Sequence, residues 1–405
     1  MPRPPQASPA DPSNPATAPG AGPKLTVVLP CLNEADTLGD CIRAAVRGIA
    51  SAGVTGEVLV ADNGSTDASR QIATDLAARV VPVPERGYGS ALLGGIAAAR
   101  GEWVVMGDAD MSYDFGEIPR FVEKLEEGHD VVQGCRLPSG GGTVMDGAMP
   151  FLHRWWGNPM FSRMARWWFG TPIHDIHCGM RAFKRDFIAG LDQRCTGMEF
   201  ASEMIIKATL AGARIAEVPI TLRPDQRVTH AAHLRTFRDG WRHLRFFLMY
   251  SPRWLFWMPG LTLILLGLLA LGAGLSGVAI GGVRLDVHTM LFGTSAVVMG
   301  YQAVLFAVFT KVFGIMERFL PEDPRMNRLF ETVTLEKGLV VGVGGLLAGF
   351  VLLGVAVDEW RVAGFGDLDY AVTMRWVIPG TMLSILGVQT VLSSFFLSIM
   401  GTRRG

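Results

Sequence analysis

The sequence has few charged residues. Asp, Glu, Lys and Arg make up 18% of its 405 positions, against about 25% in soluble domains. Hydrophobic residues make up 49%, and the mean hydropathy is +0.29. This composition argues against an ordinary cytosolic protein and indicates membrane-spanning segments. The length leaves room for two or three domains of about 150 residues each.

The sequence also lacks an excess of either charge, because 37 basic residues balance 37 acidic ones. A protein that binds a polyanion over much of its surface is usually strongly basic. We therefore expect no nucleic-acid partner, and we expect any basic patch to be local.

Paired cysteines are missing as well. The five cysteines form no Cys-x-x-Cys pair, which disfavours a zinc ribbon and a disulfide framework. Reduced thiols are typical of a cytoplasmic catalytic region. Residues 1–23 contain eight prolines and no apolar run, so we expect a disordered Pro/Ala-rich tail and no secretory signal peptide.

From Lys24 onwards, short β-rich runs alternate with helical stretches. The expected strands cover 25–30, 57–62, 78–83, 102–108, 130–134 and 213–220, and the expected helices cover 34–52, 66–77, 88–100, 116–127 and 197–212. This alternation predicts βαβ units and a mostly parallel sheet in an α/β domain. Ligands of open α/β sheets bind beyond the carboxyl ends of the strands, so polar residues at those ends are the candidate site.

Four windows in the last third of the chain contain no charged residue and are long enough to cross a bilayer of about 30 Å. They cover 254–280, 289–310, 338–357 and 376–401. The loop 311–337 holds five Lys and Arg residues, whereas the two opposite loops hold three together. The positive-inside rule then predicts that this loop, the C-terminus and the N-terminal domain face the cytoplasm.

Polar residues follow three of the expected strands. Asp108 and Asp110 offer two carboxylates of the kind that Mg²⁺ or Mn²⁺ binds beside phosphate oxygens, although a solvated turn could also carry them. Asp62 ends another strand, where it could accept hydrogen bonds from a nucleobase. Ser65 or Thr66 could instead cap the next helix. With the turn after the first strand, these tips predict one nucleotide-binding rim.

An ordered set of motifs carries a resemblance to a known family. The first three are Pro30-x-x-Asn33-Glu34, Asp62-Asn63-Gly64-Ser65-Thr66-Asp67 and Asp108-Ala109-Asp110, and the others lie at 85–89, 133–136, 177–183, 197–203 and 217–220. From residue 24 to about 253 the chain resembles glycosyltransferase family 2. More narrowly, it resembles the polyprenyl-phosphate sugar synthases of the dolichyl-phosphate mannose or glucose synthase type.

The resemblance implies a glycosyltransferase-A fold with a Rossmann-like mixed sheet, a nucleotide-sugar donor, and Mg²⁺ or Mn²⁺. The implied nucleotide-sugar contacts are Pro30, Asn33, Glu34, Asp62, Gly64, Arg86, Gly87, Asp108, Ala109 and Asp110. The implied metal positions are Asp108, Asp110 and Ser112, the last standing where related enzymes often place Gln. The implied catalytic residues are Asp108, Asp110, Arg136, Arg181, Glu199 and Glu203. The two glutamates could also form an ordinary exposed helix face.

An arginine-rich stretch precedes the first expected span. Its planar guanidinium groups suit a lipid phosphate, although they could simply bind anionic headgroups. We expect the acceptor phosphate at Arg136, Arg223, Arg227, Arg235 and Arg238. Four tryptophans, Trp155, Trp156, Trp167 and Trp168, are typical of an interfacial anchor, with core packing as the alternative.

The chain therefore divides into a tail (1–23), a catalytic domain (24–222), an amphipathic juxtamembrane segment (223–253) and a four-helix membrane region (254–401). The predicted reaction transfers a hexose from UDP-glucose or GDP-mannose to polyprenyl phosphate with inversion, at the cytoplasmic membrane. The spans would anchor the enzyme and could pack in a homo-oligomer.

Two other functions compete with this one. A processive polysaccharide synthase would share the early motifs, but the Gln-x-x-Arg-Trp string typical of such enzymes is missing from the sequence. A transporter or flippase would normally carry charged groups inside its spans. The strongly polar residues within these spans are Gln302 and Gln389, and helix packing explains both.

Overall fold

The computed structural model describes residues 22–228, 236–317, 320, 326 and 334–401. The predicted tail lies almost entirely outside these residues. The chain separates into two compact units, with the division after Phe247. Each unit is described by itself.

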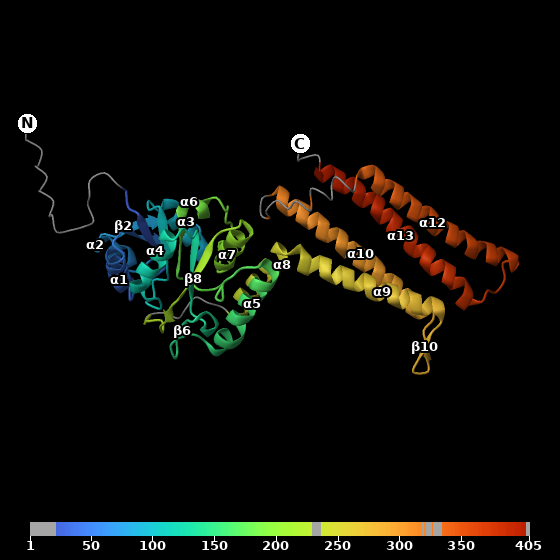
Figure 1. Ribbon diagram of the computed structural model, residues 1–405, viewed down its shortest axis with the longest axis horizontal. Coiled ribbons are helices and arrows are strands. Elements are labelled where there is room, and N and C mark those ends of the chain that lie inside the picture. The colour runs from blue at the N-terminus through green and yellow to red at the C-terminus, as the bar shows by residue number, and fades with distance from the viewer. Residues whose placement is uncertain (1–21, 229–235, 318–319, 321–325, 327–333, 402–405) are drawn as a thin grey trace, which may run out of the picture. The chain divides into compact units, whose positions relative to one another are not determined.

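The first unit begins at the blue, N-terminal end of the described chain (Figure 1). It is built on a seven-stranded sheet with the order β3-β2-β1-β4-β7-β5-β8. The strands are β1 (Leu25–Cys31), β2 (Gly56–Asp62), β3 (Arg79–Pro82), β4 (Trp103–Met106), β5 (Val131–Cys135), β7 (Arg181–Lys184) and β8 (Ile215–Pro219). Strand β7 runs antiparallel to both of its neighbours, and the other pairs are parallel. The predicted α/β domain with a mostly parallel sheet is confirmed, although β7 itself was not predicted.

Apolar helix faces pack on this sheet. The helices between residues 22 and 250 are α1 (Leu38–Ser51), α2 (Ser69–Asp75), α3 (Tyr88–Ala98), α4 (Ile118–Glu126), α5 (Asn158–Phe169), α6 (Arg185–Ala189), α7 (Phe200–Leu210) and α8 (Thr236–Tyr250), the last of which continues past the division between the units. In α4, for example, Ile118, Phe121, Val122 and Leu125 are buried, the spacing of one helix face. These side chains join a core formed by β1, β2, β4 and α1.

Short elements complete the first unit. They are the 3₁₀ turns η1 (Phe115–Glu117) and η2 (Pro138–Gly140), the π-turn η3 (His153–Gly157), and the strand pair β6 (Thr143–Val144) and β9 (Thr221–Leu222). Strand β4 ends at Met106 and not at residue 108, because the chain turns there and Met111 takes a φ of 62°. The two aspartates therefore lie in a loop beyond the strand.

The second unit contains four long apolar helices, as predicted (Figure 1). They are α9 (Met258–Ser276), preceded by the π-turn η4 (Arg253–Trp257), then α10 (Val287–Met316), α12 (Leu335–Val362) and α13 (Tyr370–Gly401). A small hairpin, β10 (Ala279–Ile280) and β11 (Val283–Arg284), joins α9 to α10. Helix α9 ends before residue 280, because Gly277 adopts a left-handed conformation after Ser276.

Glycines let the membrane helices approach closely. A Cβ atom on Gly267 of α9 would lie 2.6 Å from the carbonyl oxygen of Gly293 of α10, and one on Gly387 of α13 would lie 2.6 Å from that of Gly342 of α12. Close backbone approach at small residues is a main source of packing energy inside a bilayer. Helices α9 and α10 therefore form one closely packed hairpin, and α12 and α13 form another.

Polar side chains join α10 to α13. The Gln389 Nε2 donates to the Gln302 Oε1 at 3.0 Å, and the hydroxyl groups of Tyr301 and Thr390 lie 2.6 Å apart. The structure therefore confirms that packing between helices accounts for both glutamines.

Candidate active site

The loops that follow β1, β2 and β4 meet at the carboxyl edge of the sheet. Asn33, which has a φ of 60°, accepts a hydrogen bond from the Thr66 N–H at 2.8 Å, and its own N–H donates to the Ser65 Oγ at 3.0 Å. The Thr37 hydroxyl donates to the carbonyl oxygen of Ala109 at 2.6 Å. The structure thus brings the three polar strand tips together in one rim.

Asp62 is buried at the tip of β2. Its Oδ1 accepts the Ser65 N–H at 3.0 Å, and its Oδ2 accepts the Arg70 Nε–H at 2.7 Å. Burial raises the pKa of Asp62, but hydrogen bonds from Ser65 and Arg70 outweigh burial and hold this pKa below its usual value. Asp62 is therefore ionised and forms an ion pair with Arg70. Arg70 is half-exposed and was not predicted as a site residue.

Neither Ser65 nor Thr66 caps α2, which was the alternative considered for these two residues. The helix begins only at Ser69, and its N-cap position is Ala68. Ser65 and Thr66 instead serve Asn33, while Asp67 accepts the N–H of Ala35 at 3.0 Å and that of Ser69 at 3.0 Å. The polar cluster after β2 holds the neighbouring β1 loop.

Asn63 ties a third loop to the rim. Its side-chain amide donates to the carbonyl oxygens of Val83 and Glu85, and its Oδ1 accepts the Gly87 N–H at 2.8 Å. The Arg86 guanidinium donates to the Asn63 carbonyl at 2.7 Å and covers Gly64, where a Cβ atom would lie 3.1 Å from it. These contacts bring the predicted residues Gly64, Arg86 and Gly87 into the rim. Pro30 lies half-buried beside them, in β1.

The two aspartates after β4 differ in their partners. Asp108 accepts a hydrogen bond from the Tyr88 hydroxyl at 2.9 Å. Burial, together with the charge of Asp110, raises the pKa of Asp108 to about 6. The Asp110 Oδ1 accepts the N–H of Ser112 at 3.0 Å. Ser112 therefore supports Asp110 through its backbone, and Tyr88 is a further site residue that was not predicted.

The arginines expected at the lipid phosphate differ in their partners and in their exposure to solvent. Arg227 donates to Glu34 at 2.8 Å and lies 3.0 Å from an Asp110 oxygen. Arg223 is 45% exposed and pairs with Asp114 at 2.7 Å, and Arg238 is exposed on α8. Arg235 lies outside the described residues. Arg227 is thus part of the carboxylate rim.

Arg136 is held by a buried aspartate. Its Nε and Nη2 donate to the two Asp175 oxygens at 2.7 and 2.9 Å, and its backbone N–H donates to one of them at 3.0 Å. Burial alone would lower the pKa of Arg136, but Asp175 outweighs it and raises this pKa well above its usual value. The Nη1 atom lies 3.5 Å from the Tyr113 hydroxyl. Asp175 thus fixes the positive charge of Arg136. This charge acts on Asp108, where it partly offsets the effect of burial on the pKa of that carboxyl group.

Arg181 and Glu203 lie beneath the site and are fully buried. Arg181 donates to the carbonyl oxygens of Cys178, Ile176 and Ala201, and burial lowers its pKa. Glu203 accepts the backbone N–H groups of Arg194 and Cys195 and pairs with Lys207 at 2.9 Å. Both side chains hold neighbouring segments in place. The alternative of an ordinary exposed helix face does not apply to Glu203, because its side chain is buried.

Glu199 differs from Glu203. It occupies the N-cap position of α7. Its Oε2 is buried and has no hydrogen-bond partner within the part of the chain that the structure describes. The nearby Gly87 is close to the carbonyl oxygen of Thr196, which a Cβ atom would approach to 2.2 Å. Glu199 therefore keeps a free acceptor on a loop that packs against the rim.

Aromatic side chains cover the outer faces of η3, α5 and α8. Trp155, Trp156 and Trp167 are 57%, 68% and 70% exposed, and Trp241 is 60% exposed. On the inner faces, Phe247 of α8 packs against Phe161, Trp168 and Phe169 of α5. Core packing thus accounts for Trp168, whereas the other three predicted anchor residues face outwards.

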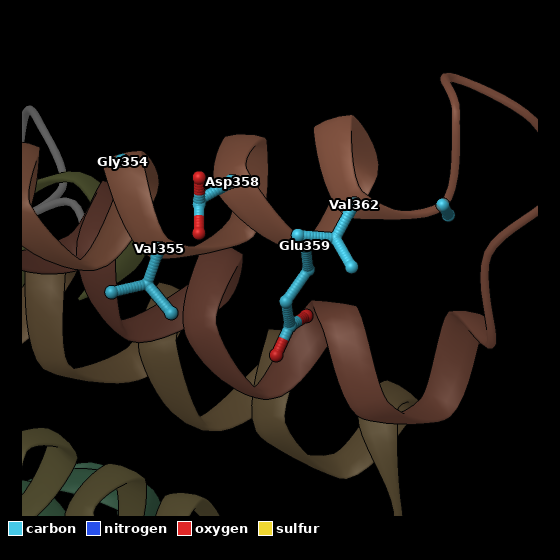
Figure 2. A pocket seen from close by; sticks show the side chains of 6 residues that line it. Gly354, Val355, Asp358, Glu359 and Val362 are labelled. Atoms are coloured by element: carbon cyan, nitrogen blue, oxygen red, sulfur yellow. The ribbon is translucent and has the colours of Figure 1, made fainter.

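Open pockets occur in both units of the described chain. One, of about 580 Å³, is lined by residues beside the Asp110 loop, among them Asp114, Arg223 and Asp225. The other, of about 560 Å³, lies on α12 around Asp358 and Glu359 (Figure 2). There, Asp358 pairs with Arg361 and Glu359 accepts the Trp376 indole N–H. The second pocket contains none of the predicted site residues.

Comparison with known proteins matches both parts of the chain. Residues 26–191 match glycosyl transferase family 2, and residues 308–401 match the glycosyltransferase family 2 C-terminal transmembrane region. The low-salt glycan biosynthesis hexosyltransferase Agl6 of Haloferax volcanii is 37% identical over 380 residues, which cover 94% of this chain and 89% of that protein.

Shorter matches cover about half of the chain. The dolichyl-phosphate hexose transferase of Haloferax volcanii is 34% identical over 200 residues, 49% of this chain and 82% of that protein. An undecaprenyl-phosphate 4-deoxy-4-formamido-L-arabinose transferase of Klebsiella pneumoniae is 32% identical over 204 residues, 49% of this chain and 59% of that protein. Among solved structures, the glucosyl-3-phosphoglycerate synthase of Mycobacterium tuberculosis, in complex with Mn²⁺, UDP and glucosyl-3-phosphoglycerate, aligns with a TM-score of 0.44 and 24% identity, over 56% of this chain and 79% of that one.

Proposed function

Because the chain belongs to glycosyltransferase family 2 and carries that family's C-terminal transmembrane region, we propose that this integral membrane glycosyltransferase moves a hexose from a nucleotide sugar to a polyprenyl phosphate. The single observation that carries the proposal is the rim of Asp62, Asp108, Asp110 and Arg136 at the carboxyl edge of the sheet. The names of the relatives support the lipid acceptor.

The donor would lie along the rim. Asp62 and Arg70 offer an acceptor and a donor to the edge of a base, and the loop of Arg86 and Gly87 would lie under the nucleotide. Uracil and guanine both present such an edge, so UDP-glucose and GDP-mannose are both candidates. Glu199, with its free Oε2, would accept a hydrogen bond from a sugar hydroxyl.

The residues present fit a divalent cation. Asp108 and Asp110 are mostly buried, and burial, together with repulsion between the two carboxylates, raises the pKa of Asp108. Hard carboxylate oxygens of this kind are the ligands that Mg²⁺ and Mn²⁺ prefer. A bound Mg²⁺ or Mn²⁺ would neutralise the diphosphate leaving group. Tyr88 and Ser112 hold the two carboxylates in place for that role.

The acceptor phosphate would approach from the membrane. Its oxygen is already anionic at neutral pH, so it needs little help from a general base. Arg136, Arg223 and Arg238 would offset repulsion between the two phosphate-bearing substrates. Direct displacement at the anomeric carbon inverts it, so an α-linked donor would give a β-linked lipid product.

The aromatic faces of α5 and α8 would rest in the headgroup layer, where Trp side chains concentrate. The five basic residues in 311–337 favour a catalytic unit on the cytoplasmic face of the cell membrane.

A donor panel tests the proposal. Purified full-length protein in detergent would receive labelled UDP-glucose, GDP-mannose or other nucleotide sugars, with polyprenyl phosphate and Mg²⁺ or Mn²⁺. We expect label to move into the organic phase with one donor, to be lost in Asp110→Asn, and to persist in Asp40→Asn, whose carboxylate is 62% exposed on α1. Label that enters long water-soluble polymer would instead indicate a processive synthase.

A further inference from the structure

A short segment, residues 223–228, lies across the loop that carries Asp108 and Asp110. We name it the strap. Its Arg223 N–H donates to the carbonyl oxygen of Ser112 at 2.9 Å, and its Gln226 N–H donates to that of Asp110 at 3.1 Å. At its far end, the Val228 N–H donates to the Asp36 Oδ2 at 3.1 Å. The strap is therefore fixed to two loops of the rim by its backbone.

Arg227 of the strap points its guanidinium at three carboxylates. It forms a bidentate pair with Glu34, at 2.8 Å from both oxygens. It also lies 3.0 Å from the Asp110 Oδ2 and 2.8 Å from the Asp225 Oδ2. Only 11% of its side chain is exposed. The guanidinium thus occupies a site whose other groups are all acidic.

Asp110 is the group that two cations would share. The proposed metal needs a lone pair of this carboxylate, while Arg227 already engages its Oδ2. A guanidinium and a divalent ion placed on the same carboxylate repel each other strongly inside a partly buried site. The ion can therefore bind well only if Arg227 withdraws or if further negative charge enters.

We propose that Arg227 is a built-in cation that competes with the divalent metal for Asp110. The inference rests on the proposed function, because it takes Asp110 to be a metal ligand. Glu34 and Asp225 keep the guanidinium nearby when the metal arrives, so Arg227 is displaced without leaving the rim. The diphosphate of a donor adds the negative charge that lets both cations stay, so metal binding becomes dependent on nucleotide.

Mn²⁺ binding measured by the electron paramagnetic resonance signal of the free ion tests this role without any turnover. The full chain in detergent is titrated with Mn²⁺ alone and again with UDP or GDP present. We expect Arg227→Gln to bind Mn²⁺ alone about tenfold more tightly than the wild type, within the usual range of coupling between two ligands. We also expect added nucleotide to strengthen Mn²⁺ binding less in this variant than in the wild type.

Arg223→Gln is the matched control. It removes the same charge from the same strap, but Arg223 contacts Asp114 and not Asp110. We expect the Mn²⁺ affinity of this variant to stay within about twofold of the wild type, since exposed pairs act weakly. An equal tightening in both variants would show a general charge effect and would overturn the inference.

Other results separate the inference from the proposed function. Unchanged or weaker Mn²⁺ binding in a folded Arg227→Gln variant overturns the competition and leaves the transferase intact. No Mn²⁺ binding by any form, with nucleotide or without it, overturns the metal site and the inference with it. Where Arg227→Gln fails to fold, Arg227→Lys carries the test, because a compact ammonium cannot span Glu34, Asp110 and Asp225 together. Tighter Mn²⁺ binding in Arg227→Lys supports the inference, and unchanged binding overturns it.

Discussion

The two units of this protein solve the packing of their interiors in opposite ways. The catalytic unit buries charged side chains, among them Arg181, Glu203 and Asp175, each 0% exposed, and satisfies them with backbone groups and opposite charges of neighbouring segments. The described membrane helices instead bring backbone against backbone at glycines and add a few neutral hydrogen bonds. Buried charge therefore positions loops around chemistry, whereas small residues set distances between helices.

The largest expected effect concerns buried charge. Arg181→Met would leave the buried carbonyl groups of Ile176, Cys178 and Ala201 without their donor, and each unsatisfied group costs about 1–3 kcal/mol. Denaturant unfolding followed by tryptophan fluorescence would measure the loss. Arg43→Met, which removes a side chain that is 51% exposed on α1, should change stability by less than about 1 kcal/mol. Similar values for the two variants would contradict the importance given to the buried guanidinium.

A second prediction concerns charge that serves catalysis. Asp110→Asn should lower hexose transfer by about 100- to 1,000-fold, the usual cost of losing one electrostatic contact in an active site. It should leave unfolding nearly unchanged, because the amide can still accept the Ser112 N–H. Initial rates in the lipid-transfer assay, with circular dichroism as the folding check, would measure both. A loss of folding equal to that of Arg181→Met would place Asp110 among the structural charges.

The glycine interfaces of the membrane unit supply the third prediction. Gly267→Leu on α9 must push α10 away, because a Cβ atom there already meets the Gly293 carbonyl oxygen. Overpacking of this kind costs about 1–3 kcal/mol. Thermal unfolding in detergent would record it. Gly272→Leu on the same helix has nothing within 4 Å of its Cβ position and should be tolerated. Equal losses would indicate that α9 packs on a different face.

The fourth prediction depends on pH. His243 on α8 bonds Ser202 at 2.9 Å, and burial lowers the pKa of His243 to about 4. In the unfolded chain this pKa is about 6.5. Between these two pH values the unfolded state therefore binds more protons at His243 than the folded state does. The contribution of neutral His243 to the free energy of unfolding is fully present above pH 6.5 and falls as pH drops towards 4, by about 2 kcal/mol at pH 5.

His243→Gln should flatten that part of the stability profile while retaining a partner for Ser202. Urea unfolding at pH 7 and pH 5 would compare the two proteins. A wild-type slope that persists unchanged in the variant would assign the pH dependence to other groups.

Local patterns predicted much of this structure. Apolar runs gave the strands β1, β2, β4, β5 and β8, and uncharged windows gave the four membrane helices. The fold class and the family membership are confirmed. Strand β7 was missed because its four residues, Arg181–Lys184, begin with a charged side chain and show no alternation. Only its two antiparallel neighbours make it a strand.

The site was predictable as a set of strand ends but not as a set of contacts. The resemblance implied a catalytic role for Arg181, and the arginine-rich stretch predicted a lipid phosphate at Arg227. In the structure, Arg181 is buried and donates to carbonyl groups of neighbouring segments, and Arg227 pairs with Glu34, 193 positions earlier in the chain. Ion pairs over such separations leave no periodic trace in the sequence. Arg70 and Tyr88 were missed for a related reason, since each acquires its role only when α2 and α3 dock against Asp62 and Asp108.

The hydrogen bonds between α10 and α13 bear on how the protein is made. Tyr301 and Gln302 enter the bilayer with the first hairpin, whereas their partners, Thr390 and Gln389, emerge from the ribosome almost 90 residues later. Until then the first hairpin carries an unpaired amide into lipid, a costly arrangement for any polar group. The insertion of α13 removes that cost, so it is also the step that commits these membrane helices to a single assembly.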